Sequence, residues 1–404
     1  MSGFSSQPVK AISQRSSDRK EFLPLSRPVI GEEEIKEVVD TLRSGWITTG
    51  PRVERFEEKF KEYLGISEAV AVSSGTAGLH LALLAAGIGP GDEVITSTMT
   101  FAATANAIVL CGARPVFVDC DPNTLNMNLG SIPGRVNRNT KAILPVHFAG
   151  QPCDMDGLAE IADRNNLRII EDAAHALGAE YKGRKIGTIG DSTIFSFHPI
   201  KAITTGEGGM VVTRHQDWAE RMRLLRFHGM RTSAWQRYSG CRLPAYSVEL
   251  PGFKYTMMDL QAAIGIHQMD RLEEFIRRRA ILAGLYDEGF EGVEGLRPLS
   301  RVRYPRRHGW HLYVVKLDLE CLSLDRDTFV EILKSRKIGA GIHFPALHLQ
   351  PYYQERWGYG RGDFPNAESV SERILSLPLF PAMTEEDVAY VVETVRELVK
   401  EHWR

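Results

Sequence analysis

Short apolar runs recur along the first half of the chain, and a stretch with helical spacing follows most of them. Their residues are rich in β-branched and aromatic types. Continuous apolar character with helical spacers is typical of strands buried on both faces of a mainly parallel sheet. The pattern predicts an α/β fold in which ligands bind at the carboxyl ends of the strands. The seven predicted strands are residues 69–74, 93–97, 114–119, 141–148, 167–172, 192–197 and 209–213.

Beyond residue 255 the pattern changes to a long amphipathic segment, residues 257–290. Apolar residues recur in it every three or four positions, which predicts one helix bridging two domains. The basic run 277–279 within it is interpreted as a solvated helix face. A strand at 310–318 and helices at 326–337 and 385–403 indicate a smaller α+β domain. We predict a flexible N-terminal tail (1–20), a large domain (21–260), and a bridging helix with a small C-terminal domain (261–404).

Composition restricts the class of protein without identifying it. With 404 residues, 25% of them charged, and a net charge of −2, the chain is typical of globular proteins and has no overall basic field for nucleic acid. Five cysteines without a CxxC motif favour a reducing compartment, so we expect a cytoplasmic protein. No apolar run is long enough to cross a membrane. The twelve histidines include no HExxH motif, and we predict no metal site.

The first candidate site is the segment "AVSSGTAGLHLAL", in which a strand is predicted to end at Ser73 or Ser74 and a helix to begin near Ala77. Ser74, Gly75 and Thr76 offer backbone N–H groups and hydroxyls at a helix N-terminus, where a phosphate group binds favourably. The same residues also serve as ordinary helix caps. The segment alone does not distinguish between these two interpretations.

Two further segments add a carboxylate and an amine. Asp172 follows a buried strand, where it could simply cap a helix or could keep a pyridine nitrogen protonated. Lys201, in "SFHPIKAITTGEGG", lies between apolar strands, and partial burial would lower its pKa. A neutral amine bonds to aldehydes. Pyridoxal phosphate has a phosphate group, a ring nitrogen and an aldehyde. The phosphate cradle, Asp172 and Lys201 together supply one partner for each of these three groups.

Two residues could complete such a cofactor site. Ser196 can provide a further hydroxyl for the phosphate group. Phe101, after the second strand, can stack on the pyridine ring or can pack in the core. The sequence leaves both interpretations of Phe101 open.

The chain resembles the sugar aminotransferases of the DegT/DnrJ/EryC1/StrS family, which are pyridoxal phosphate enzymes of fold type I, the aspartate aminotransferase fold. The resemblance runs from about Phe22 to the C-terminus. Its carriers are "SRPVIGEEEI", "SGWITTGP", "VSSGTAGLHLAL", "PVHFAGQPCDMD", "IIEDAAHALGA", "IFSFHPIKAITTGEGGMVVT" and "YTMMDLQAAIG". Through "SGWITTGP", "PGFKY" and "GIHF" it is most similar to the members that make UDP-4-amino-4-deoxy-L-arabinose.

The resemblance assigns roles by position. It implies that Lys201 bonds to the cofactor, that Asp172 contacts the pyridine nitrogen, and that His175 lies near the ring hydroxyl. It implies that the family's homodimer shares its active sites, so that Lys254 and Thr256 reach the phosphate site of the neighbouring subunit. The residues implied for the phosphate group and for stacking are Ser74, Gly75, Thr76, Ser196 and Phe101, and those implied for the substrate are Thr48, His198 and His343.

The implied reaction moves an amino group from glutamate to the 4-keto group of a UDP-linked pentose, for lipid A modification. The alternative substrate class is a UDP-4-keto-6-deoxy-hexosamine. A related sugar dehydratase would carry histidine in place of Lys201. A non-catalytic regulatory protein on the same scaffold is the alternative from a different class. A nicotinamide enzyme is excluded because no glycine fingerprint is present.

Overall fold

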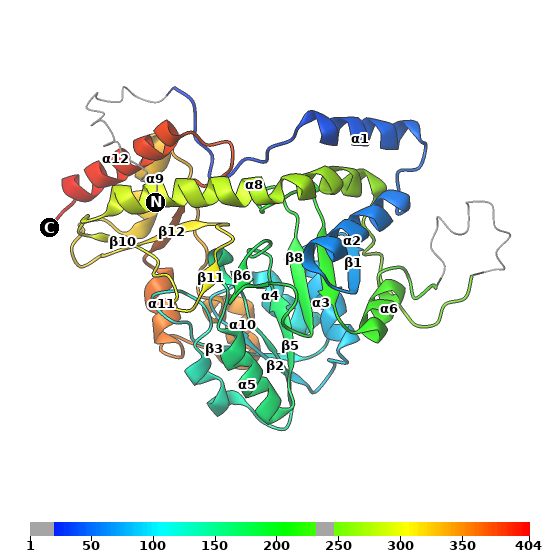
Figure 1. The fold of residues 1–404 in the computed structure, drawn as a ribbon. Coiled ribbons are helices and arrows are strands. Elements are labelled where there is room, and N and C mark those ends of the chain that lie inside the picture. Colours follow the sequence, from blue (N-terminus) through cyan, green and yellow to red (C-terminus); the bar gives the residue numbers. More distant parts are fainter. Residues whose placement is uncertain (1–19, 232–245) are drawn as a thin grey trace, which may run out of the picture.

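A computed structural model describes residues 20–231 and 246–404. Its central sheet (Figure 1) consists of the seven predicted runs. The order is β1-β9-β8-β5-β4-β2-β3, and every neighbouring pair is parallel except those of β9, which is antiparallel to β1 and β8. The α/β fold with a mainly parallel sheet is therefore confirmed. The strands are β1 (Glu68–Val72), β2 (Glu93–Ser97), β3 (Arg114–Val118), β4 (Thr140–Leu144), β5 (Arg168–Asp172), β8 (Ser192–Ser196) and β9 (Gly209–Thr213).

Helices cover both faces of this sheet. Successive side chains of a strand point to opposite faces, and in β1 Ala69 and Ala71 join one core cluster whereas Val70 and Val72 join another. Because both faces of each strand are buried, the strands appear in the sequence as continuous apolar runs. One face is covered by α2 (Pro51–Leu64), α5 (Met155–Asn165) and the first half of α8 (Asp259–Phe290), and the other by α3 (Gly75–Ala85), α4 (Ala102–Leu110) and α6 (Gln216–Leu225).

The helix α8 confirms that the long amphipathic segment forms one helix, whereas its role as a bridge between domains stays a prediction. Its 32 residues span about 48 Å. It packs against α1 (Glu32–Arg43) and α2 near one end and against α12 (Glu385–Glu401) towards the other (Figure 1). The basic run 277–279 was wrongly interpreted as wholly solvated, because Arg279 is only 1% exposed. Its guanidinium is buried against the backbone carbonyls of Trp310, His311 and Leu379.

The C-terminal part has a core of its own, built from the second half of α8, a three-stranded antiparallel sheet and two helices. The predicted division at residue 260 stays an interpretation, because α8 belongs to both parts. The predicted tail, 1–20, lies almost wholly outside the described residues. The remaining α-helices and strands of the described residues are β10 (Leu296–Pro298), β12 (Tyr313–Leu317), β13 (Ile374–Leu377), α9 (Arg326–Ser335), α10 (Pro351–Trp357), α11 (Pro365–Ser371), and a small sheet of β6 (Glu180–Tyr181), β7 (Arg184–Lys185) and β11 (Arg306–Arg307).

Strand β9 controls the geometry of the sheet edge where ligands are expected. Because β9 runs antiparallel, its first residue, Gly209, lies at the same edge as the last residues of β1 and β8. A Cβ at Gly209 would come within 2.8 Å of the backbone of Ser74 and Gly75. Only glycine therefore lets β9 start directly beneath the first turn of α3. Within the described ranges, no helix has the length and apolar character needed to cross a membrane.

Candidate active site

A cavity of about 670 Å³ opens at this edge of the sheet. Its walls come from the first turns of α3 and α4, the ends of β5 and β8, and a loop of the small domain, residues 342–350. It brings together ten of the residues singled out in the sequence, although they lie far apart along the chain. These residues are Ser74, Gly75, Thr76, Phe101, Asp172, His175, Ser196, His198, Lys201 and His343.

The predicted phosphate cradle lies at the start of α3. The helix begins at Gly75, two residues earlier than predicted, and Ser74 is its N-cap: the Ser74 hydroxyl accepts a hydrogen bond from Ala77 N–H at 3.1 Å. The capping interpretation is therefore correct for Ser74, and phosphate binding by the same turn stays a prediction. Opposite it, a Cβ added at Gly75 would lie 3.0 Å from Ser196 Cβ. The turn can therefore offer an anion free N–H groups and nearby hydroxyls from two elements.

Asp172 ends β5 and is buried, with 6% of its surface exposed. One carboxylate oxygen accepts a hydrogen bond from the Thr104 hydroxyl at 2.7 Å, and the other from Ala174 N–H at 3.1 Å. Thr104 is in turn hydrogen bonded to Thr100 at 2.7 Å. Charge-assisted bonds of this kind fix the position of a carboxylate. The carboxylate is thus held rigidly at the cavity wall.

Lys201 lies in the loop between β8 and β9, and its side chain reaches the cavity. Burial of the amine lowers its pKa from 10.5 to about 8, although attraction to Asp172 opposes this effect. The predicted partial burial is therefore present. At neutral pH an appreciable fraction of the amine is unprotonated, which suits both bond formation to an aldehyde and proton transfer.

Two histidines line the cavity beside Lys201. Burial lowers the pKa of His175 well below its usual range, and the charges of Lys201 and His343 lower it further. Its Nδ1 is buried without a hydrogen-bond partner in the described part of the chain. His343 is hydrogen bonded through Nδ1 to Ser376 at 2.8 Å, and burial lowers its pKa to about 4. Both rings are neutral at pH 7 and can donate or accept a hydrogen bond.

Phe101 is positioned by α4, for which it is the N-cap residue. Its side chain is 61% exposed and lines the cavity, with its ring centroid 5.9 Å from that of Phe344. Packing in the core, the alternative left open by the sequence, is therefore wrong for this side chain. An exposed ring at the cavity wall is available to stack on a flat ligand.

Three predicted site residues do not line this cavity. The carbonyl of Thr48 accepts a hydrogen bond from Asp259 N–H at 3.1 Å, at the start of α8. Lys254 is exposed, donates a hydrogen bond to Thr256, and lies 5.0 Å from the ring centroid of Phe227. Their roles stay predictions, because the resemblance assigns at least Lys254 and Thr256 to the site of a second subunit.

Sequence reasoning missed two residues that contact the site. Thr104 follows Phe101 by three positions, one helical turn, so helical spacing could have placed it at the same sheet edge. His311 lies with Nε2 3.4 Å from Lys201 Nζ. A contact across more than a hundred residues leaves no signal in a single sequence, where His311 suggests at most a metal ligand. Within the described residues, no cluster of three or more His, Cys, Asp or Glu side chains could hold a metal ion.

The residues present fit pyridoxal phosphate. An anion cradle, a fixed carboxylate, an amine of lowered pKa and a partnerless buried imidazole nitrogen surround one cavity. A family model, described as the DegT/DnrJ/EryC1/StrS aminotransferase family, matches residues 28–396. The chain belongs to this family. It is therefore a sugar aminotransferase of the pyridoxal phosphate-dependent type, with fold type I as predicted.

Individual relatives agree with this assignment. The chain is 49% identical over 383 residues to the spore coat polysaccharide biosynthesis protein SpsC of Bacillus subtilis, covering 95% of this chain and 98% of that protein. Spr1654 from Streptococcus pneumoniae, solved in its PLP form, is 32% identical with a TM-score of 0.87, over 94% and 99% of the two chains. The structure of DesI in the presence of its TDP-sugar product is 33% identical with a TM-score of 0.84, over 95% and 94%.

Proposed function

We propose that this aminotransferase moves the amino group of glutamate to the 4-keto group of a nucleotide-linked sugar, with Lys201 and Asp172 as its catalytic residues. The observation that carries the proposal is their convergence with the α3 cradle on one cavity. The similar protein DesI was solved in the presence of its TDP-sugar product, which supports a nucleotide-linked substrate in the same fold.

In the proposed mechanism each residue acts at a defined place. When bound, the cofactor supplies an aldehyde that carries the amino group and a ring that delocalises negative charge. Asp172 keeps the ring nitrogen protonated, and the hydrogen bonds from Thr104 and Ala174 hold its oxygens in place. Lys201 Nζ would move a proton from the donor carbon to the cofactor carbon in the first half of the reaction, and from the cofactor carbon to the sugar carbon in the second half. The face from which Nζ approaches sets the configuration of the new amine.

For the sugar, we propose a UDP-4-keto-pentose that yields UDP-4-amino-4-deoxy-L-arabinose, as in lipid A modification. The support is the similarity of "SGWITTGP", "PGFKY" and "GIHF" to the enzymes with that product. A UDP-4-keto-6-deoxy-hexosamine is the second candidate. The 49% identity to SpsC, whose name concerns spore coat polysaccharide, favours a role other than lipid A modification and so keeps this second candidate open.

The decisive assay incubates the protein with glutamate and a panel of UDP- and TDP-linked 4-keto sugars and measures 2-oxoglutarate release. Release with the pentose alone supports the arabinose assignment, and release with the hexosamine replaces it. Lys201→Ala should show no turnover with any sugar while remaining folded. Turnover by that variant would remove Lys201 from the mechanism, and no release from wild type with any sugar of the panel would contradict the proposed donor and substrate.

We also propose a homodimer with shared active sites. Large apolar side chains are exposed on the segments around α1 and the start of α8, which a second copy would cover. They include Ile35, Leu42, Ile47, Val248 and Met258.

Subunit mixing tests the sharing of sites. Lys201→Ala and Lys254→Met proteins, each of low activity, are unfolded together and refolded as hybrids. A shared site predicts partial recovery, because one of the two sites in each hybrid is intact. If the mixture is no more active than its components, the sharing is wrong.

A further inference from the structure

His311 lies directly behind the amine of Lys201, on a segment that does not line the cavity. Its side chain is 3% exposed, and Nε2 is 3.4 Å from Lys201 Nζ. Its ring centroid is 4.2 Å from that of His175. We propose that His311 is a positioning residue for Lys201. Its Nε2 accepts a hydrogen bond from Nζ, so that the other N–H groups of the amine, and its lone pair in the unprotonated form, point towards the cavity.

The backbone holds His311 firmly in this place. His311 N–H donates to Ala149 O at 3.0 Å, and Gly309 N–H donates to Gly150 O at 2.8 Å. A Cβ at Gly150, whose φ is +97°, would lie 2.9 Å from Trp310 N. Glycine is therefore required for this segment to approach so closely. The position of the imidazole is set by main-chain contacts rather than by a mobile side chain.

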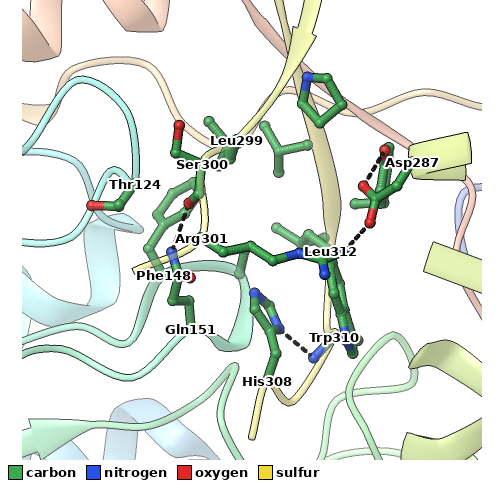
Figure 2. A pocket seen from close by; sticks show the side chains of 14 residues that line it. Thr124, Phe148, Gln151, Asp287, Leu299, Ser300, Arg301, His308, Trp310 and Leu312 are labelled. Atoms are coloured by element: carbon green, nitrogen blue, oxygen red, sulfur yellow. Dashed lines mark hydrogen bonds and ion pairs between the residues drawn. The ribbon is translucent and has the colours of Figure 1, made fainter. Parts of the chain in front are cut away.

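The far side of the segment is also packed. Figure 2 shows His308 and Trp310 at a small separate cavity, their rings stacked with centroids 4.0 Å apart. Arg301 lies 5.1 Å from the Trp310 ring centroid and forms an ion pair with Asp287 of α8. These contacts clamp the residue that precedes His311. The ring of His311 is thus held towards Lys201.

The direction of the hydrogen bond follows from the chemistry of the amine. Proton transfer takes Lys201 through both the free amine and the ammonium form, and an ammonium has three donors and no acceptor. Only an unprotonated Nε2 accommodates both forms, so His311 carries its proton on Nδ1. Burial lowers the pKa of His311 well below its usual range, with the charges of His175 and Lys201 acting in the same direction, so that the ring stays neutral.

This tautomer leaves a buried N–H unpaired, since Nδ1 of His311 has no hydrogen-bond partner in the described part of the chain. An unpaired buried donor destabilises the fold. Such a cost is typical of a residue placed for function rather than stability. The other titratable or charged groups facing this pair are Asp172 from β5, His175, Arg279 from α8 and His343 from the small domain.

The first test measures Lys201 in cofactor-free protein, through the pH dependence of its acylation by acetic anhydride, read by peptide mass spectrometry. Wild type should react half-maximally near pH 8. His311→Phe keeps a ring beside His175 but has no acceptor for the ammonium, so its midpoint should fall by about one pH unit. His311→Gln keeps an acceptor oxygen and should resemble wild type. An unchanged or raised midpoint in His311→Phe would overturn the proposal.

Two further measurements cover other outcomes. If His311→Phe does not fold, ¹⁵N NMR of histidine-labelled wild type, assigned with His311→Gln, reports the tautomer directly. A proton on Nε2, or a charged ring, would refute the proposal.

For turnover, the inference rests on the proposed role of Lys201. The isotope effect with glutamate deuterated at C2 should rise in His311→Phe and not in His311→Gln, and no rise would also overturn it. The acylation and NMR tests need no turnover, so they stand even if the proposed function fails.

Discussion

Replacing Lys201 by methionine should stabilise the cofactor-free protein in a pH-dependent way. Burial lowers the pKa of Lys201 from 10.5 to about 8 in the folded state. Between these values the unfolded chain binds more protons than the folded one, so wild-type stability rises with pH through this window. At 1.36 kcal/mol per pKa unit, the folded protein loses about 3 kcal/mol below pH 8 by burying an ammonium. Methionine, of similar length and apolar, removes this loss.

The free energy of unfolding should be measured by urea denaturation between pH 7 and 10.5 for wild type, Lys201→Met and, as a control, Lys36→Met. Lys36 is exposed on α1, so its replacement should give a difference from wild type that does not vary with pH. The advantage of Lys201→Met should be greatest below pH 8 and should shrink by about 3 kcal/mol by pH 10.5. Tyrosines that titrate there are common to all three proteins and cancel. A difference that is constant across the range would refute the burial of a charged amine.

Three other substitutions test the supports of the site. Gly209→Ala should weaken cofactor binding, measured by absorbance titration, and should lower the free energy of unfolding by roughly 1–3 kcal/mol, because its Cβ would lie 2.8 Å from backbone atoms. The control Gly134→Ala, with open space around the added Cβ, should change neither quantity. Asp172→Asn should lower kcat by roughly 100-fold or more with an unchanged circular dichroism spectrum; near-normal turnover would contradict its role. Arg279→Met should lower the free energy of unfolding by roughly 2–4 kcal/mol because it leaves buried carbonyls unpaired, whereas exposed Arg277→Met should not.

The sequence was informative about the sheet because every strand in it is buried on both faces. Such strands are continuous apolar runs, and all seven lie within a few residues of their predicted bounds. The long helix was equally clear from its periodicity. The burial of Arg279 could not be predicted, because three consecutive arginines give no sign of which one points into the core. Its partners are backbone carbonyls, and these carry no sequence signal.

For the site, several of the residues found in advance end a strand or begin a helix. Asp172 ends β5 and the α3 cradle follows β1, so local sequence places them at the sheet edge, whereas Lys201 was found from the apolar strands on both sides of its loop. His311 approaches Lys201 from the small domain side, through a fold of the chain that no periodicity encodes. The two residues assigned to a neighbouring subunit, Lys254 and Thr256, lie outside the cavity of their own chain, and only an assembled dimer can test them.

The antiparallel strand β9 explains why three segments so distant in sequence form one site. If β9 were parallel, Gly209 would lie at the opposite edge, and the loop carrying Lys201 would have to cross the whole sheet. Because β9 returns between β8 and β1, the short loop 197–208 stays at the carboxyl edge. The first residue of β9, Gly209, then pairs with Ser196 of β8 and lies against the first turn of α3. The direction of β9 and its place between β8 and β1, which an apolar run does not reveal, therefore bring the amine close to the predicted phosphate cradle.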